Sequence, residues 1–233
     1  MSSPFSLSND WQLNWRRIPS NLNRPAYING ESPKENKALK ALAAVGIIGG
    51  RQLSRLFALD KKRLRKMVRE QKLVRHEMTL DKMIIPIYSL GTVGAIIADA
   101  HGFKINYWVE YRIQDVLKRI LFFELYHHFP DSAIIPAPEP FIGVMKYKKN
   151  PLFVYVTRGD INDLLMFLKW QNKSFSDRII VITESLKHLQ SLKVHIKNKK
   201  IRMTTDEELL HKKCSIQNLF YFLDDNGEFV KEA

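Results

Sequence analysis

The chain has 233 residues, of which 45% are hydrophobic, and its 37 Lys and Arg outnumber its 24 Asp and Glu to give a formal net charge of +13. This length and hydrophobic content can support one large or two small cores, and the positive charge favours a polyanionic partner such as nucleic acid. The single Cys, Cys214, excludes an internal disulfide and a Cys-rich zinc site, and no apolar run approaches the roughly 18 residues of a membrane span. Because Met1 to Asp10 does not resemble an export signal, we expect a cytoplasmic protein without membrane contact, metal or cofactor.

Residues 1–31 are predicted to form an N-terminal arm and not a domain. They contain Ser, Asn, Pro and scattered aromatic residues, but no helical or strand period. Trp11 and Trp15 lie beside Arg16 and Arg17, and exposed tryptophans are costly to leave in water. We therefore expect the arm to dock on the protein itself; docking on a partner and disorder are the alternatives.

Residues 32–104 begin with the signals of three helices. Ser32-Pro33-Lys34-Glu35 combines an N-cap, a first-turn proline and a capping-box glutamate, which predicts a helix to about Val45. A short second helix is expected from Gln52 to Phe57. Asp60 is the expected N-cap of a third helix over Lys61 to Gln71.

Two short β-prone runs follow these helices, Leu73 to Met78 and Ile84 to Leu90, and predict a β-hairpin. A small-residue helix from Thr92 to Ala100 is expected to close the domain. Three helices followed by a hairpin is the order of a winged helix-turn-helix, so residues 32–104 are predicted to be a winged-helix DNA-binding domain.

The third predicted helix is amphipathic. At 100° per residue its apolar side chains gather on one side, while Lys62, Arg65, Lys66 and Arg69 gather opposite. One face can then pack while the other meets phosphates, because the major groove, about 12 Å wide, accepts one helix. The alternative is a solvated basic helix face without a partner. The candidate DNA-binding residues are Lys61, Lys62, Arg63, Arg65, Lys66 and Arg69 of this helix, with Arg51, Arg55, Arg75 and Lys82 as clamps on the DNA backbone.

Residues 105–233 are predicted to form an α/β domain. It should begin with a long helix from about Val109 to His128, and the tail around Asp225-Asn226-Gly227 predicts a terminal hairpin. Helices are also expected from Asp160 to Trp170 and from Ser185 to Leu192. The strands expected in this domain are Ala133 to Ala137, Phe141 to Tyr147, Leu152 to Thr157, Arg178 to Thr183 and Ile201 to Thr204.

Several of these segments resemble the winged helix of the replication-relaxation family, whose members come from plasmids and mobile elements of Gram-positive bacteria. The motifs are Gly50-Arg51-Gln52-Leu53-Ser54-Arg55-Leu56-Phe57, Arg63-Leu64-Arg65-Lys66-Met67-Val68, Leu73-Val74-Arg75, and Pro86-Ile87-Tyr88-Ser89-Leu90 with Gly94. A fainter likeness continues through Ile113-Gln114-Asp115-Val116 and from Phe153 to Gly159. The resemblance implies a role in replication, transfer or transposition of a mobile element, or in control of its genes.

The same resemblance implies a C-terminal domain similar in element order to restriction-endonuclease-like folds. Such nucleases need acids on their core strands to hold the divalent metal that activates water. Tyr155 and Thr157 stand where an acid and its partner are expected, and neither replaces a carboxylate as a ligand for a hard metal. Glu139 and Asp160 are better explained as a turn residue and a helix cap. We therefore expect a catalytically degenerate domain with a structural or protein-binding role.

The sequence thus predicts an α+β protein in which a winged helix-turn-helix is followed by an inactive nuclease-like interaction domain. Its expected partner is double-stranded DNA, and replication, relaxosome or transposition proteins and a second copy of the chain are further candidates. Two other functions remain open at this point: a metal-dependent nuclease that processes DNA, and a transcriptional regulator that senses a ligand.

Overall fold

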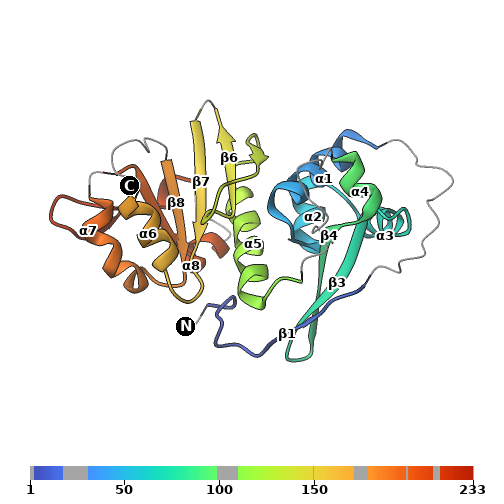
Figure 1. The fold of residues 1–233 in the computed structure, drawn as a ribbon, viewed down its shortest axis with the longest axis horizontal. Helices are drawn as coiled ribbons and strands as arrows, with labels where there is room; N and C mark the ends of the chain where they lie inside the picture. The colour runs from blue at the N-terminus through green and yellow to red at the C-terminus, as the bar shows by residue number, and fades with distance from the viewer. Residues whose placement is uncertain are drawn as a thin grey trace. The chain divides into compact units, whose positions relative to one another are not determined.

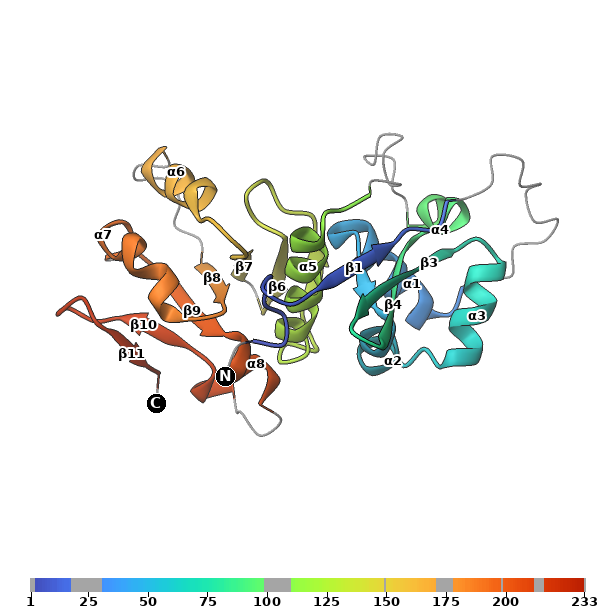
Figure 2. The ribbon, with the colours of Figure 1, turned by 90° about the horizontal axis from the view of Figure 1, so that it is seen from below.

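The computed structural model describes residues 3–17, 31–98, 110–148, 150–170, 178–197, 199–211 and 216–232. These residues form eight α-helices and two β-sheets in a mixed α+β arrangement (Figures 1 and 2). The chain divides into two compact units: an N-terminal unit of residues 10–120, and a C-terminal unit of residues 1–9 and 121–233. No helix within the described ranges is long and apolar enough to cross a membrane.

The N-terminal unit contains the expected three helices and hairpin, in the expected order. The sheet of this unit has the strand order β1-β3-β4-β2, with antiparallel pairing throughout. Its elements in chain order are β1 (Trp11–Asn14), α1 (Pro33–Val45), β2 (Ile48–Gly49), α2 (Gly50–Phe57), α3 (Lys61–Arg69), β3 (Leu73–Leu80), β4 (Met83–Leu90) and α4 (Thr92–Ile97).

Both predicted N-caps are present. The Ser32 hydroxyl accepts a hydrogen bond from the backbone N–H of Glu35, and a carboxylate oxygen of Asp60 accepts one from Arg63 N–H at 2.6 Å. Each cap satisfies a backbone donor that the first helical turn leaves without a partner. Helix α3 ends two residues before the predicted Gln71, because that residue has a positive φ of 56°, which a right-handed helix cannot contain.

The turn after α3 is held by a close approach of α4. The N–H of Gly91 donates to the carbonyl of Lys72 at 2.9 Å. A Cβ atom at Gly94 would lie 1.9 Å from that same carbonyl oxygen, so this position requires glycine. The close approach fixes the chain between α3 and β3, and the predicted extension of α4 to Ala100 lies partly outside the described residues.

The structure corrects the prediction that the N-terminal arm lacks secondary structure, because part of the arm is a β-strand. Residues Trp11–Asn14 form β1, which pairs antiparallel with β3 from Trp11 opposite Leu80 to Asn14 opposite Glu77. Four residues are too few for alternation to stand out in the sequence, and the free edge of the longer β3 supplies the hydrogen-bonding partners. Docking of the arm on the protein itself is confirmed: the Trp15 ring packs edge-on against His76 at a centroid distance of 4.7 Å.

Helix α5 (Ile113–Tyr126) begins later than expected, since residues 110–112 are not helical. The second half of α5 belongs to the C-terminal unit, and the strands of that unit come after it in the chain. They form one sheet with the strand order β11-β10-β9-β8-β7-β6-β5. The remaining elements are β5 (Ala133–Ile135), β6 (Gly143–Tyr147), β7 (Asn150–Val156), α6 (Asn162–Trp170), β8 (Arg178–Thr183), the 3₁₀ helix η1 (Leu186–Leu192), α7 (Lys193–Ile196), β9 (Ile201–Thr205), α8 (Asp206–Leu210), η2 (Ile216–Asn218), β10 (Tyr221–Leu223) and β11 (Phe229–Lys231).

The five predicted strands of this unit and its terminal hairpin are confirmed. The helix expected from Ser185 is a 3₁₀ helix continued by α7. Strands β7, β8 and β9 are parallel to one another, and Tyr155, Val181 and Met203 pack in one core with α6 and η1. The ends of these three strands therefore meet at two shared edges, here called the carboxyl edge and the amino edge.

Candidate nucleic-acid interface

Helix α3 separates its apolar and cationic side chains as the sequence predicts. Leu64 and Met67 are buried against the core. The exposed cations, called here the basic face of α3, are Lys61, Lys62, Arg65, Lys66 and Arg69. A row of cations on a helix that buries its other side is the pattern needed to contact a polyanion without losing the fold.

One member of the basic face has an ion-pair partner on the same helix surface. The Lys66 ammonium lies 3.6 Å from a Glu70 carboxylate oxygen, and its side chain is 48% exposed. The Glu70 side chain is only 14% exposed and lies closer to the Lys72 ammonium, at 3.0 Å, so it keeps a cation when Lys66 contacts another anion. Lys66 can therefore exchange this partner for a phosphate at little cost.

Arg63 is placed differently from the other predicted cations of α3. Its guanidinium donates to the carboxylate of Glu35 on α1, and this hydrogen bond raises the pKa of Arg63. Its side chain is 26% exposed. Arg63 therefore ties α3 to α1 and does not belong to the basic face.

Lys72 is fully buried and holds the same junction from the other side. Its ammonium lies 3.0 Å from Glu70, 3.6 Å from Glu35 and 3.8 Å from Glu31. In the sequence Lys72 follows the cations of α3 by only three residues and cannot be told apart from them. The structure instead encloses it among carboxylates that compensate the charge, which connects the start of β3 to α1 and α3.

The predicted backbone clamps occupy three other elements. Arg51 and Arg55 are exposed on α2, and Lys82 is exposed at the hairpin turn. Arg75 on β3 is 2.9 Å from the Glu77 carboxylate. Arg75 and Arg65 both lie near the Tyr88 hydroxyl: burial raises the pKa of Tyr88, and the two cations oppose that shift. Arg75 is thus brought close to the basic face.

The hairpin turn also exposes two large apolar side chains. Met83 is 59% exposed and Ile84 is 61% exposed, directly after Lys82. Asp81 has a positive φ of 52°, as the first residue of a two-residue hairpin turn often does. The turn therefore presents one cation and two apolar groups.

His76 anchors the arm to β3, which sequence reasoning missed. One ring nitrogen lies 2.9 Å from the Ser89 hydroxyl, and the other accepts the backbone N–H of Arg16 at 3.0 Å. Burial, assisted by the charge of Arg16, lowers the pKa of His76 to about 4. The neutral ring is the form that can accept the Arg16 N–H.

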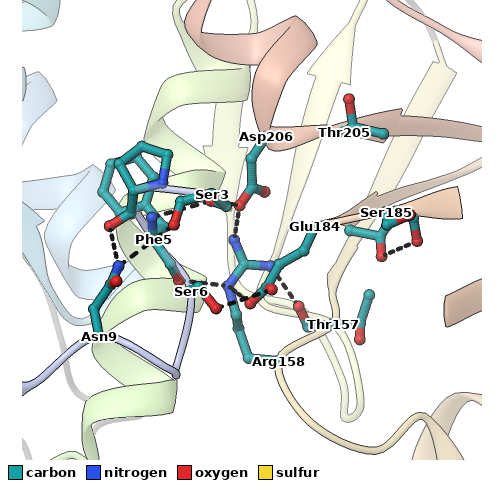
Figure 3. Close-up of polar contacts among 12 residues, drawn as sticks. Ser3, Phe5, Ser6, Asn9, Thr157, Arg158, Glu184, Ser185, Thr205 and Asp206 are labelled. Atoms are coloured by element: carbon teal, nitrogen blue, oxygen red, sulfur yellow. Dashed lines mark hydrogen bonds and ion pairs between the residues drawn. The ribbon is translucent and has the colours of Figure 1, made fainter. Parts of the chain in front are cut away.

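The carboxyl edge of β7, β8 and β9 carries a buried polar cluster that was also missed (Figure 3). The Arg158 side chain is fully buried and donates to Asp206 at 2.6 Å, to the Thr157 carbonyl at 2.6 Å and to the Phe5 carbonyl at 3.1 Å. Glu184 lies 3.7 Å from the Arg158 guanidinium.

Residues of the N-terminal segment 3–9 complete this cluster. The Ser3 hydroxyl donates to Asp206, and the Ser6 hydroxyl donates to Glu184 at 3.1 Å. Figure 3 shows Ser3, Phe5 and Ser6 on the same side of the Arg158 guanidinium. The cluster is thus a covered, charge-compensated junction between the segment and the sheet.

The residues that the sequence places at a nuclease-like site have other roles in the structure. The Tyr155 hydroxyl donates to Asp163 at 2.6 Å, and burial together with this bond raises the pKa of Tyr155 well above its usual range. The Thr157 N–H donates to the Ile182 carbonyl. Asp160 accepts the Asn162 N–H at 2.7 Å, as a residue at the start of a helix does, and Glu139 is exposed before Pro140.

The sequence does contain a signal for the missed cluster. At the carboxyl end of each parallel strand a Thr is followed by a charged residue: Thr157-Arg158 directly after β7, Thr183-Glu184 at the end of β8 and Thr205-Asp206 at the end of β9. Residues that follow neighbouring parallel strands meet at one edge of the sheet. The sequence predicts all three strands, but it was not foreseen that they are neighbours in one parallel sheet, which is what brings the three charged residues together.

No protein-family model, no curated protein and no solved structure matches this chain. Within the described ranges, no group of three His, Cys, Asp or Glu side chains is placed to hold a metal ion. Cys214 lies outside the described residues.

Proposed function

We propose that this protein binds double-stranded DNA through the basic face of α3, as a winged helix-turn-helix. The observation that carries the proposal is the set of five cations exposed on a helix whose opposite side is buried in the core. The element order α1-β2-α2-α3-β3-β4, with β2 paired to β4, supports it, since a wing formed by β3 and β4 then follows the recognition helix.

In this proposal α3 enters the major groove and its neighbours hold the DNA backbone. Arg51 at the start of α2 and Arg55 one turn later are the clamps before α3, and Lys82 is the clamp at the wing tip. Arg63 has a positioning role, because its bond to Glu35 sets the direction of α3. Phosphate contacts fix such a helix in register, and base contacts then provide specificity.

For the C-terminal unit we propose a non-catalytic role in binding other proteins. The hydrogen bonds of Tyr155 and Asp160 support this, because they stabilise the fold at the positions where a nuclease-like site would need metal ligands. A place in replication, transfer or transposition of a mobile element, as in the replication-relaxation family, is the biological setting that fits this pair of roles.

The test is the salt dependence of duplex binding by a variant with four Ala substitutions, K62A, R65A, K66A and R69A. Removing one cation that pairs with a phosphate flattens the slope of log K against log [salt] by about 0.9, so the variant should show a slope shallower by about 3.6 and only a small part of the parent's affinity. Fluorescence anisotropy of a labelled duplex between about 50 and 200 mM salt measures both.

A matched control removes the same charge elsewhere. Lys146, Lys148, Lys187 and Lys197 are exposed in the C-terminal unit, and their combined replacement by Ala should change the slope far less. Equal slopes for the two variants would contradict the proposal. Mg²⁺-dependent cleavage of plasmid DNA that Glu139→Ala abolishes would instead establish the nuclease.

A further inference from the structure

The C-terminal end of α6 exposes a large aromatic side chain. Trp170 is 78% exposed, and Met166, one turn earlier on the same helix face, is 49% exposed. Most residues of this size bury their apolar surface, and exposed apolar groups that adjoin one another mark interaction sites. The position of Trp170 is therefore unusual for a part of the surface without a partner.

Cations from two segments lie at this helix end, Lys169 in the last turn of α6 and Lys199 before β9. The Lys199 ammonium donates to the carbonyl of Leu168 in the last turn of α6 at 3.4 Å. The Lys200 carbonyl accepts the N–H of Ile179, at the start of β8, at 3.0 Å. The Trp170 surface, as it is called here, comprises Trp170 with the exposed cations Lys169 and Lys199. Arg178 and Lys200 come directly before Ile179 and Ile201, whose side chains pack in one core with α6, so strand alternation places them on the opposite face of the sheet.

The topology explains why these residues meet. Strands β8 and β9 are parallel and begin at the amino edge, and α6 returns to that edge before β8 starts. The acidic residue of α6, Asp163, lies at the opposite end of the helix and accepts a hydrogen bond from Tyr155. The Trp170 surface consequently combines an exposed aromatic ring with two neighbouring cations.

We propose that the Trp170 surface binds single-stranded nucleic acid. Base stacking on an exposed aromatic ring, combined with cations that follow the phosphates, is how proteins hold single strands without reading their sequence. A duplex fits less well, because its bases are already stacked on one another. A second copy of the chain also fits less well, because a two-fold interface would place the same two cations opposite one another.

The experiment measures binding of a labelled oligothymidylate of about 12 nucleotides to the full chain by fluorescence anisotropy. The α3 variant K62A/R65A/K66A/R69A serves as background, so that any strand held by the basic face does not obscure the result. Trp170→Ala should weaken binding about tenfold, while Trp170→Phe, which keeps an aromatic plane, should weaken it much less.

A second variant tests the two cations. Lys169 and Lys199 replaced together by Ala should flatten the salt slope by about 0.7 for every phosphate that these cations neutralise, the value for single strands. Circular dichroism spectra that match the parent show that each variant is folded. Equal affinities of the parent, Trp170→Phe and Trp170→Ala for the oligonucleotide would overturn the proposal, as would a change in oligomeric state on Trp170→Ala without a change in oligonucleotide affinity.

The two proposals fail separately. If duplex binding is unaffected by the α3 variant, the role of the basic face is wrong, while the Trp170 surface can still be judged from the oligothymidylate series. If Trp170→Ala leaves the oligonucleotide affinity unchanged, duplex binding through α3 is not affected.

Discussion

Arg158 and the cations on the basic face of α3 show two opposite uses of positive charge in one chain. Arg158 is fully buried at the carboxyl edge, with Asp206 and two carbonyl oxygens as hydrogen-bond acceptors. Lys62, Arg65 and Arg69 are exposed on α3. A buried cation must be compensated by the protein itself, whereas an exposed one is compensated by solvent until a polyanion replaces it.

This difference separates residues that hold the fold from residues available to a ligand. Net charge and charge runs cannot make the distinction, since Lys72 belongs to the same basic stretch as Lys66 and yet is fully buried among carboxylates. Removing a buried charge should change stability, and removing an exposed one should change binding. The following four predictions test that division.

The largest effect is expected at the carboxyl edge. Asp206→Ala leaves the buried Arg158 without its closest carboxylate, and such a change costs about 3–5 kcal/mol of unfolding free energy. Urea denaturation followed by circular dichroism measures it. The double variant R158M/D206L, which removes both charges, should recover much of the stability; a destabilisation below about 1 kcal/mol for Asp206→Ala would show that the pair is not a buried, coupled one.

A pH-dependent destabilisation is expected from His76. Its pKa is lowered from 6.5 to about 4, chiefly by burial, so between these values the unfolded chain takes up a proton that the folded chain does not. Stability should fall as the pH drops through this window, by about 1.4 kcal/mol per unit and about 3 kcal/mol in all, and stay unaffected by His76 above it.

Urea denaturation at about pH 7, 5.5 and 4 checks this, with His76→Gln as the reference. The other acidic groups titrate in both proteins, so the difference between the two curves isolates His76. Parallel curves for the parent and His76→Gln would show that the ring is already protonated, or accessible, in the folded protein.

A smaller effect is expected at the cap of α3. Asp60→Ala removes the acceptor for the Arg63 N–H and should cost about 1 kcal/mol, whereas Asp60→Asn, which retains a capping oxygen, should cost clearly less. Thermal and urea unfolding of the two variants provide the comparison. Equal destabilisation by the two substitutions would mean that the charge of Asp60, and not its capping bond, stabilises the helix.

The smallest stability change is expected for the K62A/R65A/K66A/R69A variant. These side chains are exposed and Ala is a strong helix former, so the free energy of unfolding should stay within about 0.5 kcal/mol of the parent, even though the proposed duplex binding should be strongly weakened. Unfolding curves measured at the salt concentration of the binding assay test this. A large destabilisation would show that the basic face is part of the fold.

Local signals in the sequence predicted much of the N-terminal unit. Ser32 and Asp60 were identified as caps because a cap acts on residues only three positions away. The two sides of α3 followed from helical periodicity, with Leu64 and Met67 buried as expected. The start of α5 was missed because residues 110–112 carry no comparable stop or start signal.

By itself the sequence determined most of the helices and strands in the described parts of the chain, though not β1, β2 or α8, and which face of α3 carries charge, because these depend on neighbours within a few positions. Only the tertiary structure decided that Arg158 meets Asp206 48 residues later, that Ser3 meets Asp206 across 203 residues, and that Lys72 is enclosed. It alone also placed Lys199 beside the last turn of α6. The physical reason is that burial and charge compensation depend on which distant segments pack together, and a charged side chain has the same identity in the sequence whether water or a carboxylate surrounds it.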